Sequence, residues 1–152
     1  MQSQLKRPSV LRLATLFFLG LAALPLTTQA QETQDTTKLA PELRTVRADW
    51  SNGVLNRDAG AAGAAFADSV VVQFQGEVFN GKSAAVAWLI DALAGVTSIR
   101  FSPSTFVIAS GEVVERTSYV VVMADGEAPG VTESTWRKMP DGSWKIVRFI
   151  VS

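Results

Sequence analysis

The chain contains no cysteine and no histidine, and these two absences exclude several kinds of chemistry. Without cysteine there is no disulfide, no thiol nucleophile and no thiolate metal site. Without histidine, Ser-His-Asp hydrolysis and histidine-bound zinc or iron are excluded. The glycines at positions 60, 63, 76 and 81 lack the spacing and the lysine of a phosphate-binding loop. We therefore expect no metal and no cofactor.

The chain also lacks an excess of positive charge. It has 14 basic and 14 acidic residues, and three of the basic ones, Lys6, Arg7 and Arg12, lie in the first thirty positions. The basic residues that follow are scattered and are outnumbered by acidic ones. A nucleic-acid partner normally requires a basic face, so this balance argues against one.

The first thirty residues have the pattern of a secretory signal. Basic residues precede an apolar run from Leu13 to Leu26, and Thr28-Gln29-Ala30 offers the small residues that signal peptidase reads. An uncleaved membrane anchor is the alternative, but the run is shorter than the ~20 residues that a membrane span needs. We expect cleavage before Gln31, export to the periplasm or the medium, and no membrane association of the mature chain.

The remaining residues form one domain by length. Residues 31–39 are polar and are predicted to be a flexible leader, and residues 40–152 are predicted to fold. The order of the predicted elements indicates an α+β class with helices packed on one face of a curved antiparallel sheet. The predicted helices are 41–56, 59–66 with Asp58 as N-cap, and 82–93; the predicted strands are 69–75, a short hairpin at 76–81, 96–109 bent at Pro103, 112–124, 131–138 and 144–151.

The last strand follows a clear turn, Pro140-Asp141-Gly142. A three-residue loop there sets Trp136 opposite Ile146, and simple alternation then turns Arg148 toward the inner face of the sheet. A two-residue turn would instead direct Phe149 inward.

The order of elements, together with several short motifs, resembles the nuclear transport factor 2-like superfamily, which includes SnoaL-like cyclases and ketosteroid isomerases. The resemblance covers essentially all of the chain after the signal segment. It implies a cone-shaped, cystatin-like α+β fold with a central pocket between the helices and the concave sheet face. It also implies homodimers, because these sheets commonly pair back to back. The motifs are Trp50 with Asn56-Arg57-Asp58, Phe66-Ala67-Asp68 before Val70-Val71-Val72, Gly81-Lys82, Trp136-Arg137-Lys138, and Asp141-Gly142-Ser143-Trp144-Lys145-Ile146-Val147-Arg148.

The resemblance does not carry over the isomerase chemistry. In the ketosteroid isomerases, a tyrosine on the first helix and an aspartate on the following strand do the chemistry. Their places fall at Trp50 and at about Phe74 or Gln75, and none of these side chains is a proton-transfer base. We predict no catalytic residue set.

Strand alternation and the resemblance together give candidate pocket residues, although each aromatic among them also suits an ordinary core. Tyr119 is the only tyrosine and so the only phenolic donor. An inward Arg148 either pairs with Glu133, Glu115 or a carbonyl group, or holds a ligand carboxylate. The segment 112–116 is expected on an exposed strand surface, with cross-strand ion pairs. The candidates are Trp50, Trp88, Phe101, Tyr119, Ser134, Trp136 and Arg148.

Three functions follow as hypotheses. The leading one is an exported domain of the SnoaL-like type that binds a small apolar or amphipathic molecule. The second is a small isomerase, cyclase or dehydratase that uses Asp49 or Glu133 as a base with Tyr119 or Arg148 as the electrophilic group. The third is a dimeric protein-interaction module whose apolar outer face comes from the valine-rich strand 113–123.

Overall fold

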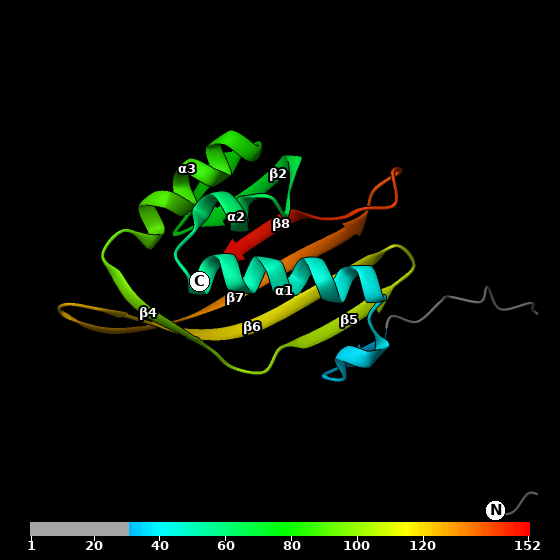
Figure 1. The fold of residues 1–152 in the computed structure, drawn as a ribbon, viewed down its shortest axis with the longest axis horizontal. Coiled ribbons are helices and arrows are strands. Elements are labelled where there is room, and N and C mark those ends of the chain that lie inside the picture. The colour runs from blue at the N-terminus through cyan, green and yellow to red at the C-terminus, as the bar shows by residue number, and fades with distance from the viewer. Residues whose placement is uncertain (1–30) are drawn as a thin grey trace, which may run out of the picture.

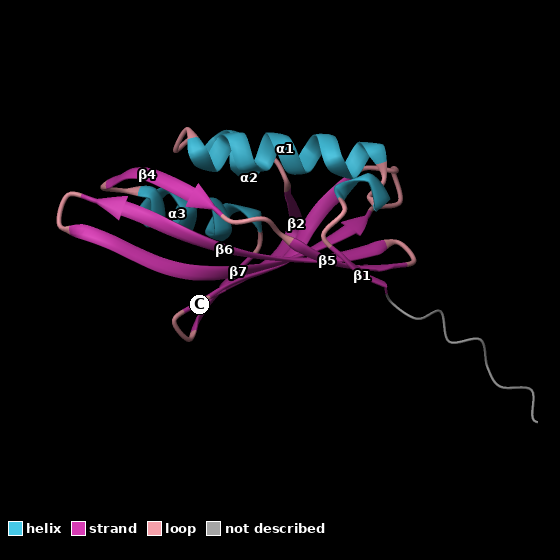
Figure 2. Ribbon diagram, turned by 90° about the horizontal axis from the view of Figure 1, so that it is seen from below, coloured by secondary structure: helices cyan, strands magenta, loops and turns pink. Residues whose placement is uncertain are grey.

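The computed structural model describes residues 31–152; residues 1–30, with the predicted signal peptide and its cleavage site, lie outside the described part. In residues 31–152, helices lie on one side of a curved, open sheet of eight strands (Figures 1 and 2). The α+β class is as predicted. The helices are η1 (Thr36–Lys38), α1 (Pro41–Leu55), α2 (Ala59–Gly63) and α3 (Lys82–Leu93). The strands are β1 (Gln31–Thr33), β2 (Phe66–Phe74), β3 (Glu77–Asn80), β4 (Val96–Phe101), β5 (Thr105–Ala109), β6 (Glu112–Met123), β7 (Gly126–Lys138) and β8 (Trp144–Val151).

The helix boundaries follow local capping chemistry. Proline at the start of α1 lacks an N–H that a first helical turn would leave unpaired. The side chain of Asp58 caps α2 by accepting a hydrogen bond of 2.9 Å from the backbone N–H of Ala61. Helix α2 ends at Gly63, before the predicted Phe66, because Phe66 already belongs to β2. Nowhere in residues 31–152 is a helix long and apolar enough to cross a membrane.

Helices α1 and α2 pack closely through a glycine. A Cβ atom at Gly53 of α1 would lie 2.6 Å from the backbone nitrogen of Ala62 in α2. Any side chain at position 53 would therefore separate the two helices.

The sheet order is β1-β5-β6-β7-β8-β2-β3, and β4 pairs with β6 beside β5. The predicted segment 96–109 thus divides at Pro103 into two strands that share one edge of β6. The sheet is antiparallel, as predicted, except at one pair, because β2 and β8 run parallel. Strand β8 lies between β7 and β2, so it is an interior strand of the sheet.

The first described residues differ from the predicted flexible leader. Strand β1 pairs with β5, with Glu32 opposite Val107, and Leu39 is 4% exposed within the core. Polar composition predicted a free segment here. Backbone pairing does not depend on side-chain polarity, and the burial of Leu39 brings the segment between β1 and α1 into contact with the core.

The hairpin between β7 and β8 has the predicted three-residue loop. The N–H of Gly142 donates to the carbonyl of Met139 at 2.9 Å, and Gly142 has φ of +85°, a region that favours glycine. Trp136 lies opposite Ile146, as predicted.

A β-bulge then reverses the alternation along β8. Ile146 pairs with Trp136, but Arg148 pairs with the next residue, Thr135, so Val147 is extra. Beyond the bulge Phe149 points inward and is 4% exposed, whereas Arg148 is exposed on the outer face. The prediction that Arg148 points inward is therefore wrong, although the loop length on which it was based is right.

Candidate functional site

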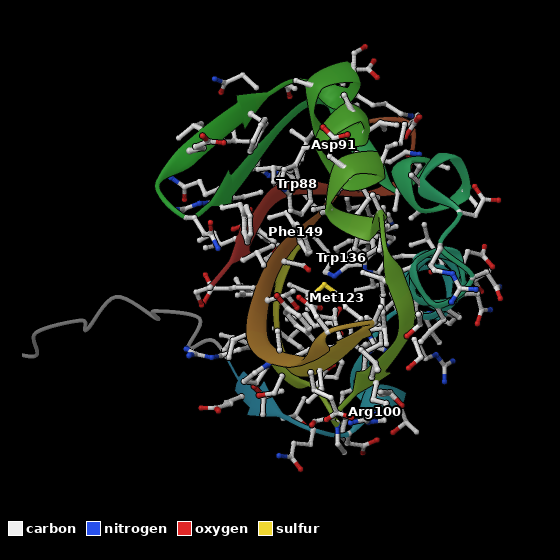
Figure 3. All side chains as sticks on the ribbon, turned by 90° about the vertical axis from the view of Figure 1, so that its left-hand side faces the viewer. Trp88, Asp91, Arg100, Met123, Trp136 and Phe149 are labelled. Atoms are coloured by element: carbon white, nitrogen blue, oxygen red, sulfur yellow. The ribbon has the colours of Figure 1, made fainter. Side chains whose placement is uncertain are left out.

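A cavity of about 400 Å³ lies between the inner face of the sheet and helices α1 and α3. Its exposed lining residues, which mark the mouth, include Gln75, Ala92 and Pro129. Figure 3 views the molecule from the end where β4 and the β6–β7 hairpin lie, with Met123, Phe149 and Trp88 around the space between α3 and the sheet. The buried lining of the cavity is apolar and includes Trp50, Val54, Leu89, Val96, Ile99 and Phe149.

Strand pairing explains why β4 and β6 line the cavity. Phe101 lies opposite Tyr119, and Ile99 lies opposite Val121. These residues alternate with outward-facing ones, so each strand contributes every second side chain to the cavity wall.

A chain of aromatic contacts runs along the inner side of the cavity. The ring of Trp50 on α1 lies 5.3 Å from that of Phe149 on β8, and the ring of Phe149 lies 6.0 Å from that of Trp88 on α3. The ring of Trp88 also lies 5.9 Å from that of Phe74 on β2. These spacings are typical of tilted and edge-to-face pairs. The wall between α1, α3 and the sheet is therefore a connected aromatic surface.

Tyr119 provides a polar group in the cavity wall. Its ring covers Gly130 on β7, where any side chain would overlap it. Its hydroxyl has no hydrogen-bond partner within residues 31–152, and burial raises the pKa of the phenol above 10.0. The nearby Thr132 hydroxyl donates to the carbonyl of Thr117 at 3.4 Å. At neutral pH the Tyr119 hydroxyl is thus a protonated donor that a ligand can reach.

No Asp, Glu, Lys or Arg side chain lines this cavity in the described part of the chain. Asp49 is exposed on α1, away from the lining. Glu133 lies on the outer face, because its β7 neighbours Thr132 and Ser134 face inward. Arg148 donates to the side-chain oxygen of Gln73 at 3.0 Å on that same outer face.

Glu115 lies within the core, contrary to the predicted exposed surface for segment 112–116. It is 6% exposed, and its Oε1 accepts hydrogen bonds of 2.7 Å from Arg47 Nε and from Ser104 Oγ. Its Oε2 accepts one of 3.0 Å from the indole nitrogen of Trp136. Arg47 comes from α1, so this buried polar cluster ties α1 to the sheet. In the sequence, Glu115 alternates with Val113 and Thr117, a pattern that places all three side chains on the inner face of the strand. The prediction of a surface position was based on the charge of Glu115 instead.

Four of the seven predicted pocket residues line the cavity: Trp50, Trp88, Phe101 and Tyr119. The other three, Ser134, Trp136 and Arg148, do not. Ser134 and Trp136 are buried in the interior, and Arg148 is on the outer face of the sheet. Lining residues that the sequence analysis did not propose include Leu89, Ile99 and Met123, and inner-face alternation identifies Ile99 and Met123 once β4 is paired with β6. Phe149 also lines the cavity; the sequence offered it only as the alternative to Arg148.

The part of the chain that the structure describes contains no group of three or more His, Cys, Asp or Glu side chains arranged to hold a metal ion. The cavity offers hydrophobic burial, the hydroxyl of Tyr119 and a few further polar side chains, those of Gln75, Thr132 and Ser152.

Comparison with known proteins identifies the fold. No protein-family model and no curated protein matches the sequence. Among solved structures, a nuclear transport factor 2-like protein of unknown function from Pseudomonas putida KT2440 has a TM-score of 0.63 at 21% identity, covering 73% of this chain and 83% of that one. A candidate ketosteroid isomerase from Shewanella frigidimarina NCIMB 400 has a TM-score of 0.62 at 14% identity, covering 73% and 94%. A nuclear transport factor 2-like protein with a cystatin-like fold from Novosphingobium aromaticivorans has a TM-score of 0.59 at 20% identity, covering 72% and 78%.

These likenesses show the class of structure. The chain has the nuclear transport factor 2-like, cystatin-like fold, as the sequence motifs predicted. At these identities the likeness concerns the fold alone, and function has to be argued from the cavity.

Proposed function

We propose that the protein binds a small apolar or amphipathic molecule in the cavity between α1, α3 and the sheet. The observation that carries the proposal is the cavity itself, about 400 Å³ in volume and lined mainly by apolar side chains. This volume lies within the range of small-molecule sites, which combine an apolar wall with a few polar groups. The unpartnered hydroxyl of Tyr119 is such a group.

The geometry favours binding over the enzyme hypothesis. Trp50, Phe74 and Gln75, which occupy the places of the isomerase tyrosine and aspartate, do lie in the cavity lining. None of these side chains is a proton-transfer base, and the two proposed carboxylates, Asp49 and Glu133, do not line the cavity.

A neutral dye tests this proposal. N-phenyl-1-naphthylamine fluoresces more strongly in apolar surroundings, and we expect saturable binding of one molecule per chain. Ala128→Phe adds a ring to the cavity lining and should weaken binding about tenfold or more. Ala109→Phe makes the same change at an exposed position of β5 and should leave binding unchanged. Equal affinity of the two variants would contradict the assignment of the cavity as the site.

Export is part of the proposal. The signal-like pattern of residues 1–30 supports it, and the N-terminal sequence of the protein recovered from a periplasmic fraction tests it. We expect that sequence to begin at Gln31; recovery of the uncleaved chain in the cytoplasm would contradict export.

Self-association through the outer face of the sheet is also proposed. Val114, Val120 and Val122 of β6 alternate with inward residues, and Val107 of β5 is 36% exposed beside Val114. Sedimentation equilibrium should give a dimer for the wild-type chain and a monomer for Val120→Lys. A wild-type monomer at high concentration would exclude this pairing.

A further inference from the structure

A second hollow, which we call the α3–β3 groove, lies on the other side of Trp88 from the cavity. Its volume is about 510 Å³, and its lining includes Phe74, Phe79 and Trp88 with two carboxylates, Glu77 and Asp91. The groove and the cavity share Phe74, Trp88 and Ala92 as lining residues, so they adjoin along α3.

Strand pairing and helical spacing bring these side chains together. Glu77 lies opposite Phe74, an inward residue of β2, so Glu77 is on the side of the hairpin that faces α3. Trp88 and Asp91 are three residues apart on α3 and share one face of the helix (Figure 3). The ring of Trp88 lies 6.1 Å from that of Phe79. Three aromatic rings and two carboxylates therefore border one groove.

The two carboxylates have no partner in the described part of the protein. Neither the Glu77 nor the Asp91 side chain makes an ion pair or a hydrogen bond within residues 31–152. Other carboxylates do: Glu127 pairs with Arg100 at 2.9 Å, and Glu112 pairs with Arg137 at 2.9 Å.

Asp91 also lies at the unfavourable end of its helix. It occupies the last turn of α3, where the free carbonyl groups carry partial negative charge and no basic residue balances them. The lining of the groove therefore carries two carboxylates and no basic side chain.

Neither hollow has a basic residue in its lining. Arg148, for which a ligand carboxylate was one of the two partners considered, is on the outer face of the sheet. An anionic ligand would meet two carboxylates and no basic side chain, whereas a cation would meet both carboxylates beside aromatic rings.

We infer that the ligand is an amphipathic cation of the organic ammonium class. Its apolar part lies in the cavity and its charged head lies beside Trp88, between Asp91 and Glu77. This inference rests on the proposed binding function and specifies the ligand class for it.

Competition among three molecules of equal chain length tests the inference. At neutral pH, octylammonium, octanol and octanoate are cationic, neutral and anionic, and each is used to displace N-phenyl-1-naphthylamine from the full-length mature protein. We expect octylammonium to displace the dye at about fivefold lower concentration than octanol, and octanoate to be the weakest. The advantage of octylammonium should shrink as salt is added, because the groove is exposed to solvent.

Two variants and a control locate the charged head. Asp91→Asn and Glu77→Gln each remove one carboxylate from an exposed position and should each reduce the octylammonium advantage about two- to fivefold, with octanol unaffected. Asp49→Asn removes an exposed carboxylate of α1 that lines neither hollow, and it should leave the concentrations at which octylammonium and octanol displace the dye unchanged.

The outcomes separate this inference from the proposed function. The cation inference is overturned, and the binding function left intact, if octanol displaces the dye at as low a concentration as octylammonium does. The same holds if octylammonium still displaces the dye at a lower concentration than octanol in the double variant Asp91→Asn/Glu77→Gln. An equal loss in Asp49→Asn also overturns it, because a general charge effect would then explain the preference. Failure of the dye to bind the wild-type protein overturns both.

Discussion

Replacing Glu115 by alanine should destabilise the fold strongly, because this carboxylate satisfies donors from two layers of the molecule. The indole nitrogen of Trp136, a residue with 0% exposure, would lose its acceptor, and an unsatisfied buried donor costs about 1–3 kcal/mol. Arg47 would lose its ion-pair partner, and removing one member of a buried pair costs about 3–5 kcal/mol. The Arg47 side chain is 25% exposed and keeps a hydrogen bond to Ser104, so the cost of losing the ion pair belongs at the low end of that range. With the low end of both ranges, about 1 kcal/mol for the indole donor and about 3 kcal/mol for the ion pair, we expect a total loss of about 4 kcal/mol in the free energy of unfolding.

The same strand provides a matched control. Glu112 pairs with Arg137 at 2.9 Å, but both side chains are largely exposed, at 38% and 56%. An exposed ion pair contributes about 0–1 kcal/mol, so Glu112→Ala should change little. Urea unfolding followed by tryptophan fluorescence measures both variants under identical conditions.

A double-mutant cycle separates the ion pair from the rest of the cluster. Arg47→Leu and Glu115→Leu together should cost less than the sum of the single changes, with a coupling energy of about 1 kcal/mol or more. If Glu115→Ala is no more destabilising than Glu112→Ala, or if the cycle shows no coupling, the buried cluster does not hold α1 on the sheet and the reasoning is refuted.

Two further predictions concern titration and backbone conformation. The single tyrosine, Tyr119, should titrate above pH 10.0 by ultraviolet absorbance, because burial disfavours the phenolate. Since the pKa of Tyr119 is then higher in the folded state than in the unfolded one, the stability of the protein should fall as pH rises past about 10. An ordinary tyrosine pKa in the folded protein would contradict the buried position. Gly142→Ala should lower the free energy of unfolding by about 1–2 kcal/mol, because φ is +85° and no atom lies near enough to add a packing effect. Gly142→Asn should lower it less, since asparagine tolerates this backbone region better. Equal losses in the two variants would point to a cause other than backbone conformation.

Local chemistry made much of this fold predictable. Pro41 and Asp58 set the starts of α1 and α2 through groups that lie within one turn, and Pro140-Asp141-Gly142 set the hairpin loop in the same way. Alternation and helical spacing also placed Trp50, Trp88, Phe101 and Tyr119 on inner faces. These features depend on neighbours in the sequence, so the sequence is enough to infer them.

Other features depend on contacts between distant segments. The bulge at Val147 arises where β8 pairs with β7 on one side and with β2 on the other, and one extra residue leaves no mark on the alternation of the sequence. That bulge exchanges Arg148 for Phe149 on the inner face. It thereby removes a positive charge from the inner face and adds an aromatic ring to the cavity wall.

The burial of Glu115 has a similar origin, because its partners Arg47, Ser104 and Trp136 come from separate elements and meet only in the folded chain. The sequence by itself therefore determined the class of fold, through the order of its elements, and the starts of α1 and α2 and the final turn, since each of these is decided within a few residues. The tertiary structure alone decided the charge and shape of the cavity, because those depend on which of two neighbouring side chains a strand turns inward.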